Sequence, residues 1–192
     1  MGSVGVLALQ GDVREHLATL AALGVGAERV RTPAELDAVA ALVLPGGEST
    51  AIAHLLRTSG LADALGERLA AGLPVLGTCA GLILLAREVL DGRADQWGYG
   101  ALAVAVRRNG YGRQIASFEA PLTLSDGTSV PGVFIRAPRI EACGPGVEVL
   151  ATYDHDGEAD PVLVRQGPVW GASFHPELTA DTTVHRLFVE SL

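Results

Sequence analysis

One cysteine of this sequence has the neighbours that a catalytic nucleophile would need. Cys79 lies at the centre of Gly-Thr-Cys-Ala-Gly, residues 77–81, between a short apolar run at 74–76 and a longer apolar segment of helix-forming residues. A strand, a tight turn with small residues beside it and a helix together form a nucleophile elbow. The positive end of the helix dipole would stabilise a thiolate there. The pattern therefore favours a cysteine nucleophile, with a buried core cysteine as the alternative.

A nucleophilic cysteine needs a base, and His175 is the best candidate. It follows an apolar strand expected at 169–174, and Glu177 comes two residues later. Residues i and i+2 of extended backbone point to the same side, so Glu177 could hold the imidazole and stabilise its charged form. The alternative is a strand-end histidine beside a helix-capping carboxylate. Three of the remaining histidines fall in expected helices and are interpreted as surface or packing residues: His16, His54 and His185. His155 lies in an expected turn and is interpreted as solvated.

Two glycines after another expected strand could supply the group that stabilises a developing negative charge. Gly46 and Gly47 follow the apolar run at 41–44, and paired glycines let the backbone approach a ligand closely. The N–H groups of Gly47 and Ala80 could together form an oxyanion hole for a tetrahedral intermediate. The alternative is an ordinary turn in which Ser49 caps the following helix.

Two further stretches could bind an acidic substrate group. Residues 107–114 contain three arginines and Asn109, the single asparagine of the chain, and arginine pairs bidentately with carboxylates. Residues 134–138, Phe-Ile-Arg-Ala-Pro, could form a substrate wall if they face the cysteine. A solvated loop and an exposed strand end are the alternatives. We expect no metal site, because the chain has no Cys-x-x-Cys or His-x-x-x-His spacing.

Strands and helices alternate in the first half of the chain, and these elements must position the candidate residues. Strands are expected at 4–9, 27–31, 41–44 and 74–76, and helices at 13–23, at 33–39, from about 51 and at 61–71. Asp12 resembles an N-cap with Glu15 as its capping-box partner. Such alternation is typical of a parallel sheet with helices on both faces, where ligands bind beyond the carboxyl ends of the strands. The loops 10–12, 45–50 and 77–81 leave those ends, so we expect them near one site.

From about residue 91 the pattern changes to short β-type segments separated by turns. They are expected at 101–107, 120–124, 130–134, 147–153, 161–165 and 169–174. We expect this half to be antiparallel and to flank or extend the parallel sheet, with turns at Asp126-Gly127 and Asp156-Gly157 and a last helix at 183–192. No repeat, linker or composition break marks a boundary, so one domain is expected over residues 1–192.

Composition excludes several classes of protein. The chain has 192 residues, enough for one domain with a buried core, and a net charge of −8, which disfavours binders of nucleic acid or anionic membranes. All 14 basic residues are arginine, which excludes Schiff-base and Walker-type lysines. The cysteines Cys79 and Cys143 do not make a disulfide framework and suit a reducing cytosol. We see no signal peptide or membrane span and expect a cytoplasmic protein.

In order and spacing, six motifs resemble those of one enzyme family. They are Leu-Gln-Gly at 9–11, Pro-Gly-Gly-Glu-Ser-Thr at 45–50, Gly-Thr-Cys-Ala-Gly at 77–81, Arg-Asn-x-x-Gly-Arg-Gln at 108–114, Phe-Ile-Arg-Ala-Pro at 134–138 and His-Pro-Glu-Leu at 175–178. Together they resemble the glutaminase subunit of the two-component pyridoxal 5′-phosphate synthase. Gly-x-Cys-x-Gly with His-x-Glu is shared by class I glutamine amidotransferases, and the other motifs carry the more specific resemblance.

The resemblance implies a three-layer flavodoxin-like α/β fold and a role for each matching residue. Cys79 would be the nucleophile, with His175 as base and Glu177 as orienting group. The N–H groups of Gly47 and Ala80 would stabilise the oxyanion. Glutamine would be held by Gly46, Gly47, Glu48, Ser49, Arg108, Ile135 and Arg136. The resemblance implies no cofactor and no metal.

It also implies partners. L-glutamine would be hydrolysed to glutamate and ammonia through a γ-glutamyl thioester, and the ammonia would pass to a synthase subunit that makes pyridoxal 5′-phosphate. The glutaminase would dock on a ring of synthase subunits and be poorly active alone. Gln10, on a loop beside the site, is a candidate reporter of docking. No nucleic acid or membrane partner is expected.

Other functions fit some of the same residues. A different class I amidotransferase would feed ammonia to another acceptor, and the synthase that restores activity would identify it. A cysteine hydrolase or glyoxalase-like protein would share the fold, but such proteins lack His-x-Glu near the chain end. A binding protein with an inert elbow is the non-enzymatic alternative, against which the intact Cys79, His175 and Glu177 argue.

Overall fold

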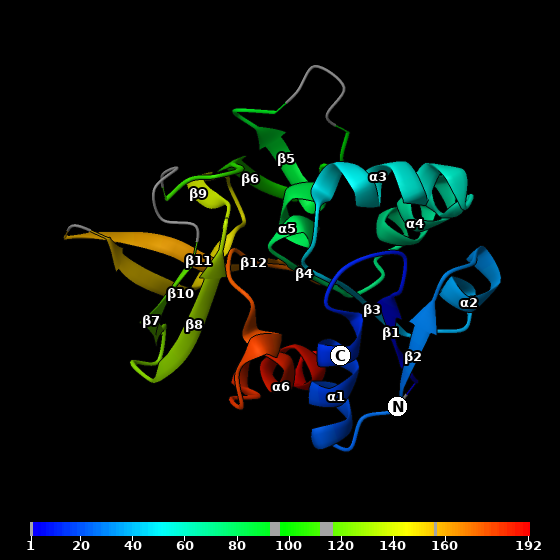
Figure 1. Cartoon of the computed structure of the whole chain (residues 1–192), viewed down its shortest axis with the longest axis horizontal. Helices are drawn as coiled ribbons and strands as arrows, with labels where there is room; N and C mark the ends of the chain where they lie inside the picture. Colours follow the sequence, from blue (N-terminus) through cyan, green and yellow to red (C-terminus); the bar gives the residue numbers. More distant parts are fainter. Residues whose placement is uncertain (1, 93–96, 112–116, 156) are drawn as a thin grey trace.

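The computed structural model describes residues 2–92, 97–111, 117–155 and 157–192, and a parallel sheet runs through its centre (Figure 1). Within these residues, five parallel strands follow the spatial order β2-β1-β3-β4-β12. Their bounds are Val4–Leu7 (β1), Ala27–Val30 (β2), Ala41–Leu44 (β3), Val75–Thr78 (β4) and Val169–Ala172 (β12). The strands point the same way, so their carboxyl ends and the loops that follow them lie at one edge of the sheet.

Both faces of this sheet are buried, and β3 shows why. Ala41 and Val43 belong to one cluster of buried hydrophobic residues, and Leu42 and Leu44 belong to the other. Successive strand residues point to opposite faces, so an uninterrupted apolar run is typical of a parallel strand covered on both sides. Fully burying a Val or Leu side chain contributes about 1.5–3 kcal/mol, so burial of both faces stabilises the parallel centre of the fold.

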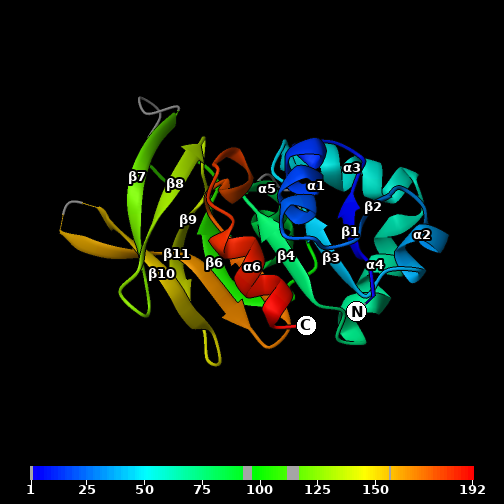
Figure 2. The same ribbon diagram turned by 90° about the horizontal axis from the view of Figure 1, so that it is seen from below.

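Helices cover the two faces (Figures 1 and 2). Leu56 of α3, Leu65 of α4 and Leu82 of α5 pack into one cluster, whereas Leu20 of α1 and Phe188 of α6 pack into the other. The helices are Val13–Ala22 (α1), Pro33–Asp37 (α2), Ser49–Thr58 (α3), Leu61–Ala70 (α4), Ala80–Leu85 (α5) and Thr183–Glu190 (α6). In the described part of the chain, no helix has the length and apolar character needed to cross a membrane.

Four antiparallel strands extend the sheet beyond β12, in the order β11-β10-β7-β8 (Figure 2). Their bounds are Ser117–Leu124 (β7), Ser129–Ile135 (β8), Glu148–His155 (β10) and Glu158–Gln166 (β11). A smaller sheet has the order β5-β6-β9, with Ala86–Val89 (β5), Leu102–Arg107 (β6) and Arg139–Cys143 (β9). The fold class predicted from the sequence is confirmed, with helices on both faces of a mostly parallel centre and an antiparallel extension.

Some details differ from the sequence-based expectation. The strand expected at 169–174 ends at Ala172 and pairs parallel with β4, so it belongs to the parallel centre and not to the antiparallel half. The first strand ends at Leu7 instead of residue 9. Strand β9 was not expected, because most of its side chains are exposed and its sequence lacks a clear apolar alternation. The turn expected at Asp156 lies outside the described residues.

Candidate active site

Cys79 lies between β4 and α5 in a backbone conformation that non-glycine residues rarely adopt. Its φ is 47° and its ψ is −100°. Its backbone N–H donates a 2.8 Å hydrogen bond to the Ala172 carbonyl oxygen, and its thiol lies 3.9 Å from the Ile135 carbonyl oxygen. A positive φ costs a side-chain-bearing residue free energy, and such strain gathers at functional sites. The strand-turn-helix arrangement predicted for this segment is therefore present.

Gly81 lets the helix after Cys79 start close to the sheet. A Cβ atom at this position would collide with the Leu44 carbonyl oxygen at the end of β3. Any side chain would push α5 away from β3 and move the turn that holds Cys79. The second glycine of the motif is thus required by a close approach of backbone to backbone.

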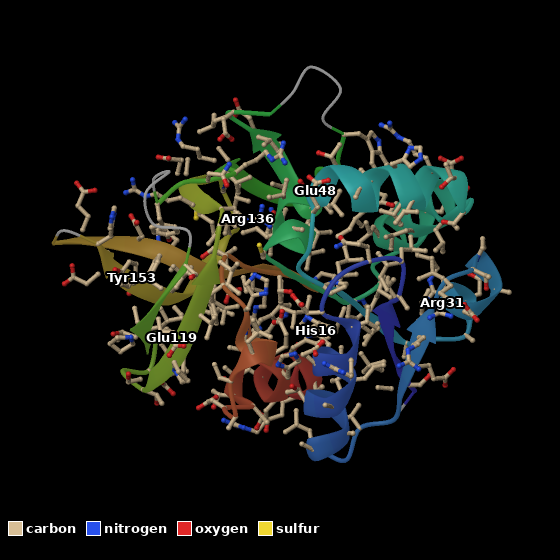
Figure 3. All side chains as sticks on the ribbon, in the orientation of Figure 1. His16, Arg31, Glu48, Glu119, Arg136 and Tyr153 are labelled. Atoms are coloured by element: carbon tan, nitrogen blue, oxygen red, sulfur yellow. The ribbon has the colours of Figure 1, made fainter. Side chains whose placement is uncertain are left out.

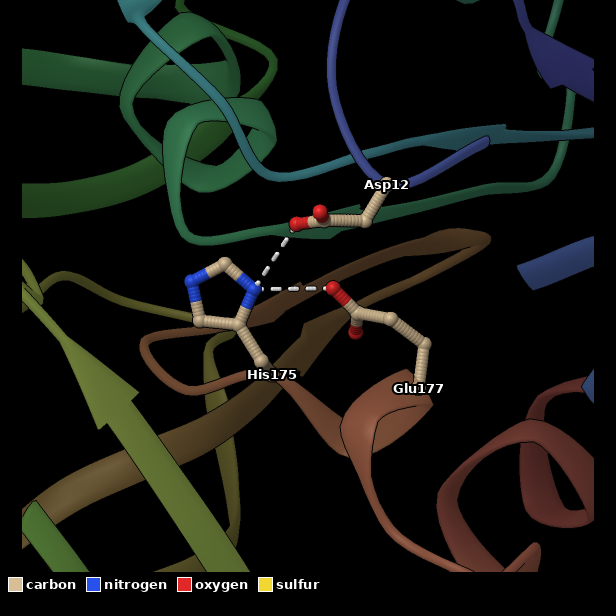
Figure 4. A group of neighbouring side chains, drawn as sticks. All are labelled: Asp12, His175 and Glu177. Carbon is tan, nitrogen blue, oxygen red and sulfur yellow. Dashed lines mark hydrogen bonds and ion pairs between the residues drawn. The ribbon is translucent and has the colours of Figure 1, made fainter. Parts of the chain in front are cut away.

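His175 and Glu177 meet directly after β12. The backbone N–H of His175 donates to the Val133 carbonyl oxygen over 2.8 Å, and Glu177 lies in the short 3-10 helix η1, Pro176–Leu178. Nδ1 of His175 is 2.8 Å from Oε1 of Glu177, and both side chains are buried (Figure 4). The pair predicted from the sequence is brought together, although a helical turn provides the geometry in place of the expected extended backbone.

Asp12 supplies a second carboxylate to the same imidazole (Figure 4). Its Oδ2 lies 3.3 Å from Nδ1 of His175. The sequence predicted Asp12 as an N-cap with Glu15 in a capping box, but its side chain makes no capping hydrogen bond. One oxygen of Asp12, one ring nitrogen of His175 and one oxygen of Glu177 lie within 4.8 Å of one another. These atoms are also spaced as the ligands of a metal ion could be. The loop 10–12 was expected near the site, but the contact between Asp12 and His175 was not predicted, because the two residues lie far apart in the sequence.

The surroundings of His175 favour its charged form. Burial lowers the pKa of His175, but the interactions with Asp12, Cys79 and Glu177 outweigh burial and raise the pKa to about 12. Burial raises the pKa of Glu177, and the hydrogen bond with His175 opposes that rise. Nε2 of His175 has no hydrogen-bond partner among the described residues. An imidazolium beside Cys79 would stabilise a thiolate.

A pocket with a volume of about 440 Å³ opens over these groups. It is lined by Gln10, Asp12, Gly47, Glu48, Ser49, Cys79, Ile83, Arg108, Asn109, Ile135, Arg136 and His175. Every residue predicted to bind substrate is in this lining except Gly46, where a Cβ atom would collide with the His175 ring. Asp12 and Ile83 were not predicted as site residues. The three loops expected to converge at the carboxyl ends of the strands thus contribute to one pocket.

Glu48 and Arg108 form a polar side of this pocket. Nη2 of Arg108 lies 3.3 Å from Oε1 of Glu48. The Glu48 carboxylate also accepts the backbone N–H groups of Thr50 at 3.1 Å and Ala51 at 2.6 Å, so Glu48 caps α3 and the alternative of Ser49 as N-cap is wrong. Burial opposes ionisation of Glu48, but these hydrogen bonds lower its pKa. The buried Ser49 hydroxyl has no hydrogen-bond partner in the described part of the chain.

Ile135, the last residue of β8, and Arg136, which follows it, form another part of the wall. Figure 3 labels Arg136. Arg136 has a φ of 45°, the left-handed region that favours glycine. The Ile135 side chain is 37% exposed, unusual for an isoleucine, and it borders the pocket that holds Cys79. A strained residue beside an exposed apolar one at the pocket is typical of a binding surface.

Gln10 and Gly47 meet at the base of the pocket. Oε1 of Gln10 accepts the Glu48 backbone N–H over 2.9 Å, and a Cβ atom on Gly47 would collide with the Gln10 carboxamide. Gly47 has a φ of 150°, which a residue with a side chain would adopt only under strain. Ala80, the other residue predicted to stabilise the oxyanion, is buried at the start of α5.

We expect Arg108→Ala to raise KM for glutamine about 10- to 100-fold with a smaller change in kcat, because a guanidinium hydrogen bond to substrate would be lost. Steady-state kinetics of glutamate release would measure it. Arg107→Ala is the matched control, since Arg107 pairs with Glu141 at 2.9 Å and is not in the pocket lining. Equal KM values for the two variants would contradict a role for Arg108 in binding.

Sequence reasoning did not predict a contact between two histidines. His16 and His185 were interpreted as surface or packing residues, and the packing alternative is correct: both are fully buried, and Nδ1 of His16 lies 2.8 Å from Nε2 of His185. Helical spacing could have located them, since His16 lies four residues before the buried Leu20 and His185 three before the buried Phe188.

Comparison with known proteins identifies the class. The profile of the SNO glutamine amidotransferase family matches residues 6–192, and the chain belongs to this family. A crystal structure described as a glutamine amidotransferase superposes with a TM-score of 0.91 at 49% identity, covering 99% of this chain and 98% of the other. The class predicted from the motifs is therefore confirmed.

Two relatives are more specific. A protein of Parafrankia sp. (strain EAN1pec) is 56% identical over 190 residues, covering 97% of this chain and 91% of its own length. A protein of Salinispora tropica is 53% identical over 190 residues, covering 97% and 94%. Each is named pyridoxal 5′-phosphate synthase subunit PdxT.

Proposed function

We propose that this chain is the glutaminase subunit of a pyridoxal 5′-phosphate synthase and hydrolyses L-glutamine with Cys79, His175 and Glu177. The observation that carries the proposal is the 2.8 Å contact between His175 Nδ1 and Glu177 Oε1, in the same pocket as the strained Cys79. The relatives at 53% and 56% identity support the assignment to vitamin B6 synthesis through their name.

The first half of the reaction forms a thioester. The Cys79 thiolate attacks the side-chain amide carbon of glutamine, and the carbonyl oxygen becomes an oxyanion. Backbone N–H groups near Gly47 and Ala80 stabilise that charge. As the tetrahedral intermediate collapses, the C–N bond breaks and His175 Nε2 donates its proton to the leaving nitrogen, which departs as ammonia. Glu177 keeps the ring oriented through Nδ1.

The second half releases glutamate. His175, now neutral, takes a proton from a water molecule, and the resulting hydroxide attacks the γ-glutamyl thioester carbon. The C–S bond breaks, Cys79 leaves as the thiolate and His175 keeps the proton. The products are one glutamate and one ammonia for each glutamine and water consumed. Cys79 and His175 return to their starting charges.

The pocket offers complementary groups for a free amino acid. Arg108 and Arg136 carry positive charge for the α-carboxylate, and Glu48 carries negative charge for the α-ammonium group. The Ser49 hydroxyl, which has no hydrogen-bond partner among the residues that the structure describes, could donate to or accept from the same end of the substrate. The side-chain amide would then extend toward Cys79.

The ammonia passes to a synthase subunit, which docks as a separate chain and stimulates the glutaminase. The hydrogen bond from the Glu48 N–H to Gln10 suits Gln10 as a reporter of docking, because the same loop lines the pocket. The thiols of Cys79 and Cys143 are free, as expected for a protein of the reducing cytoplasm.

The test is glutamate release from L-glutamine with and without the synthase subunit of a related pyridoxal 5′-phosphate synthase. We expect stimulation of about 5- to 150-fold, the usual range of coupling between a partner site and an active site. Activity that needs Cys79 but ignores the synthase would keep the amidotransferase and point to a different ammonia acceptor. No activity in either condition would overturn the proposal.

A further inference from the structure

Behind the catalytic pair lies a group of buried polar side chains that the reaction above does not use. His16 of α1, His185 of α6 and Thr78, the residue before Cys79, all have 0% exposure. Helices α1 and α6 lie side by side on one face of the sheet (Figure 2). His16 is in the first turn of α1 and faces the centre of the molecule (Figure 3). Burying a polar group lowers the stability of the folded state unless that group forms hydrogen bonds.

His16 contacts the other two members of this group and also Glu177. Its Nδ1 is 2.8 Å from Nε2 of His185, and its Nε2 is 3.2 Å from Oγ1 of Thr78. The same Nε2 lies 3.5 Å from Oε2 of Glu177. His16 therefore links the acid of the catalytic pair to the residue that precedes the nucleophile.

One carboxylate oxygen of Glu177 accepts no hydrogen bond from the described residues. Oε1 accepts from His175, whereas Oε2 is buried and has no conventional hydrogen bond within the described ranges. A buried carboxylate oxygen without a donor is destabilising. The charged or titratable groups that face Glu177 are His175, Asp12 and His16, and of these His16 is placed to donate to Oε2.

The two neutral tautomers of His16 are not equivalent. With the proton on Nε2, the single N–H lies between Thr78 Oγ1, 3.2 Å away, and Glu177 Oε2, 3.5 Å away, and Nδ1 accepts from His185 Nε2–H. With the proton on Nδ1, the Nε2 lone pair faces a carboxylate, and His185 must hold a proton on Nδ1. That nitrogen is buried without a partner in the described part of the chain. An orphaned N–H costs more than an unused lone pair, so the geometry favours the first tautomer.

The environment keeps both rings neutral. Burial, together with the nearby His185 and His175, holds the pKa of His16 well below its ordinary value. Burial lowers the pKa of His185 to about 4. A neutral pair adds no positive charge beside the His175 imidazolium, so it can orient Glu177 without weakening the charged ring.

We propose that His16 is a positioning residue for Glu177: its Nε2–H holds Oε2, which keeps Oε1 aimed at His175, and His185 sets the tautomer that makes this possible. The inference rests on the role proposed above for Glu177. The position of Glu177 matters because a second carboxylate, that of Asp12, lies 3.3 Å from Nδ1 of His175. A Glu177 side chain released from His16 would turn away from His175 and leave the ring to the longer contact with Asp12.

The experiment measures kcat/KM for glutamine across pH with the synthase subunit present, for His16→Phe, His16→Gln and His185→Leu. We expect His16→Phe to lower kcat/KM about 10- to 100-fold, the usual effect of losing a hydrogen bond to a charged group. The acidic limb of the pH profile of kcat/KM should move to higher pH in His16→Phe, because Glu177 loses a donor that favours its ionised form. His16→Gln keeps a donor at the Nε2 position and should recover most of the rate. His185→Leu should fall between His16→Phe and the wild type.

His54→Gln is the matched control, since His54 is an exposed histidine on α3 and is absent from the pocket lining. Thermal unfolding of each variant separates misfolding from mispositioning. A folded His16→Phe with the wild-type rate and pH profile would overturn the proposal, as would a folded His16→Gln as impaired as His16→Phe. If His16→Phe does not fold, the pH profiles of His16→Gln and His185→Leu decide in the same way. Loss of dependence on Cys79 in this assay would instead contradict the proposed function itself.

Discussion

Cys79→Ala is expected to lower synthase-stimulated glutamate release at least about 10³-fold, because no other group can form the thioester. Attack by water on an amide would then depend on the pocket and the backbone N–H groups alone. The variant should still bind glutamine, since the charged groups that line the pocket are unchanged. Coupled detection of glutamate, together with isothermal titration of glutamine, would measure both effects.

Cys143→Ala is the control for this result. Cys143 is the other free cysteine of the chain, is exposed on β9 and is absent from the pocket lining. It should retain wild-type activity and the wild-type reaction with iodoacetamide at Cys79. Residual activity of Cys79→Ala within tenfold of the wild type would mean that another group attacks the substrate, and the thioester mechanism would be wrong.

His175→Asn is expected to lower kcat about 10³- to 10⁴-fold, because general acid–base catalysis and thiolate stabilisation are lost together. In the native protein the interactions with Asp12, Cys79 and Glu177 raise the pKa of His175 to about 12, so the ring is charged at neutral pH. Without that charge, the rate of Cys79 alkylation at pH 7 should fall and should rise again only as the medium becomes alkaline. Alkylation quenched at successive times and analysed by mass spectrometry would measure the rate of Cys79 alkylation as a function of pH.

His155→Asn is a suitable comparison, because His155 is on β10 and outside the pocket lining. It should alter neither kcat nor the pH dependence of alkylation. An alkylation profile of His175→Asn that matches the wild type would show that the imidazolium does not stabilise the thiolate, whatever happens to kcat.

Local patterns predicted most elements of the parallel half and identified residues that the structure brings together at one pocket. The run at 41–44 became β3 without change, because a short uninterrupted apolar run followed by Pro-Gly-Gly is typical of a buried parallel strand. Cys79 was identified from its neighbours, and Gly81 proves to be required by the Leu44 carbonyl. His175 and Glu177 are two residues apart, so their contact could be anticipated from the chain alone.

Contacts between distant segments could not be predicted in the same way. Asp12 looked like a helix cap because Glu15 follows at the right spacing, yet its carboxylate faces His175. Capping preferences are worth about 1 kcal/mol, and an ion pair with a buried imidazolium can exceed that. The partner of His16 on α6 lies at the opposite end of the sequence, and no local pattern connects the two helices.

The pairing of β12 with β4 has a consequence for how the protein is made. One side of β4 is covered by β3, but the other side is completed by residues 169–172, which are synthesised long after β4. Until then, β4 is an unpaired edge and the Cys79 N–H lacks its acceptor on Ala172. A chain that ends before β12 therefore contains Cys79 but neither His175 nor the strand that fixes the turn of Cys79. The candidate site can be assembled only after β12 and the residues that follow it have been synthesised.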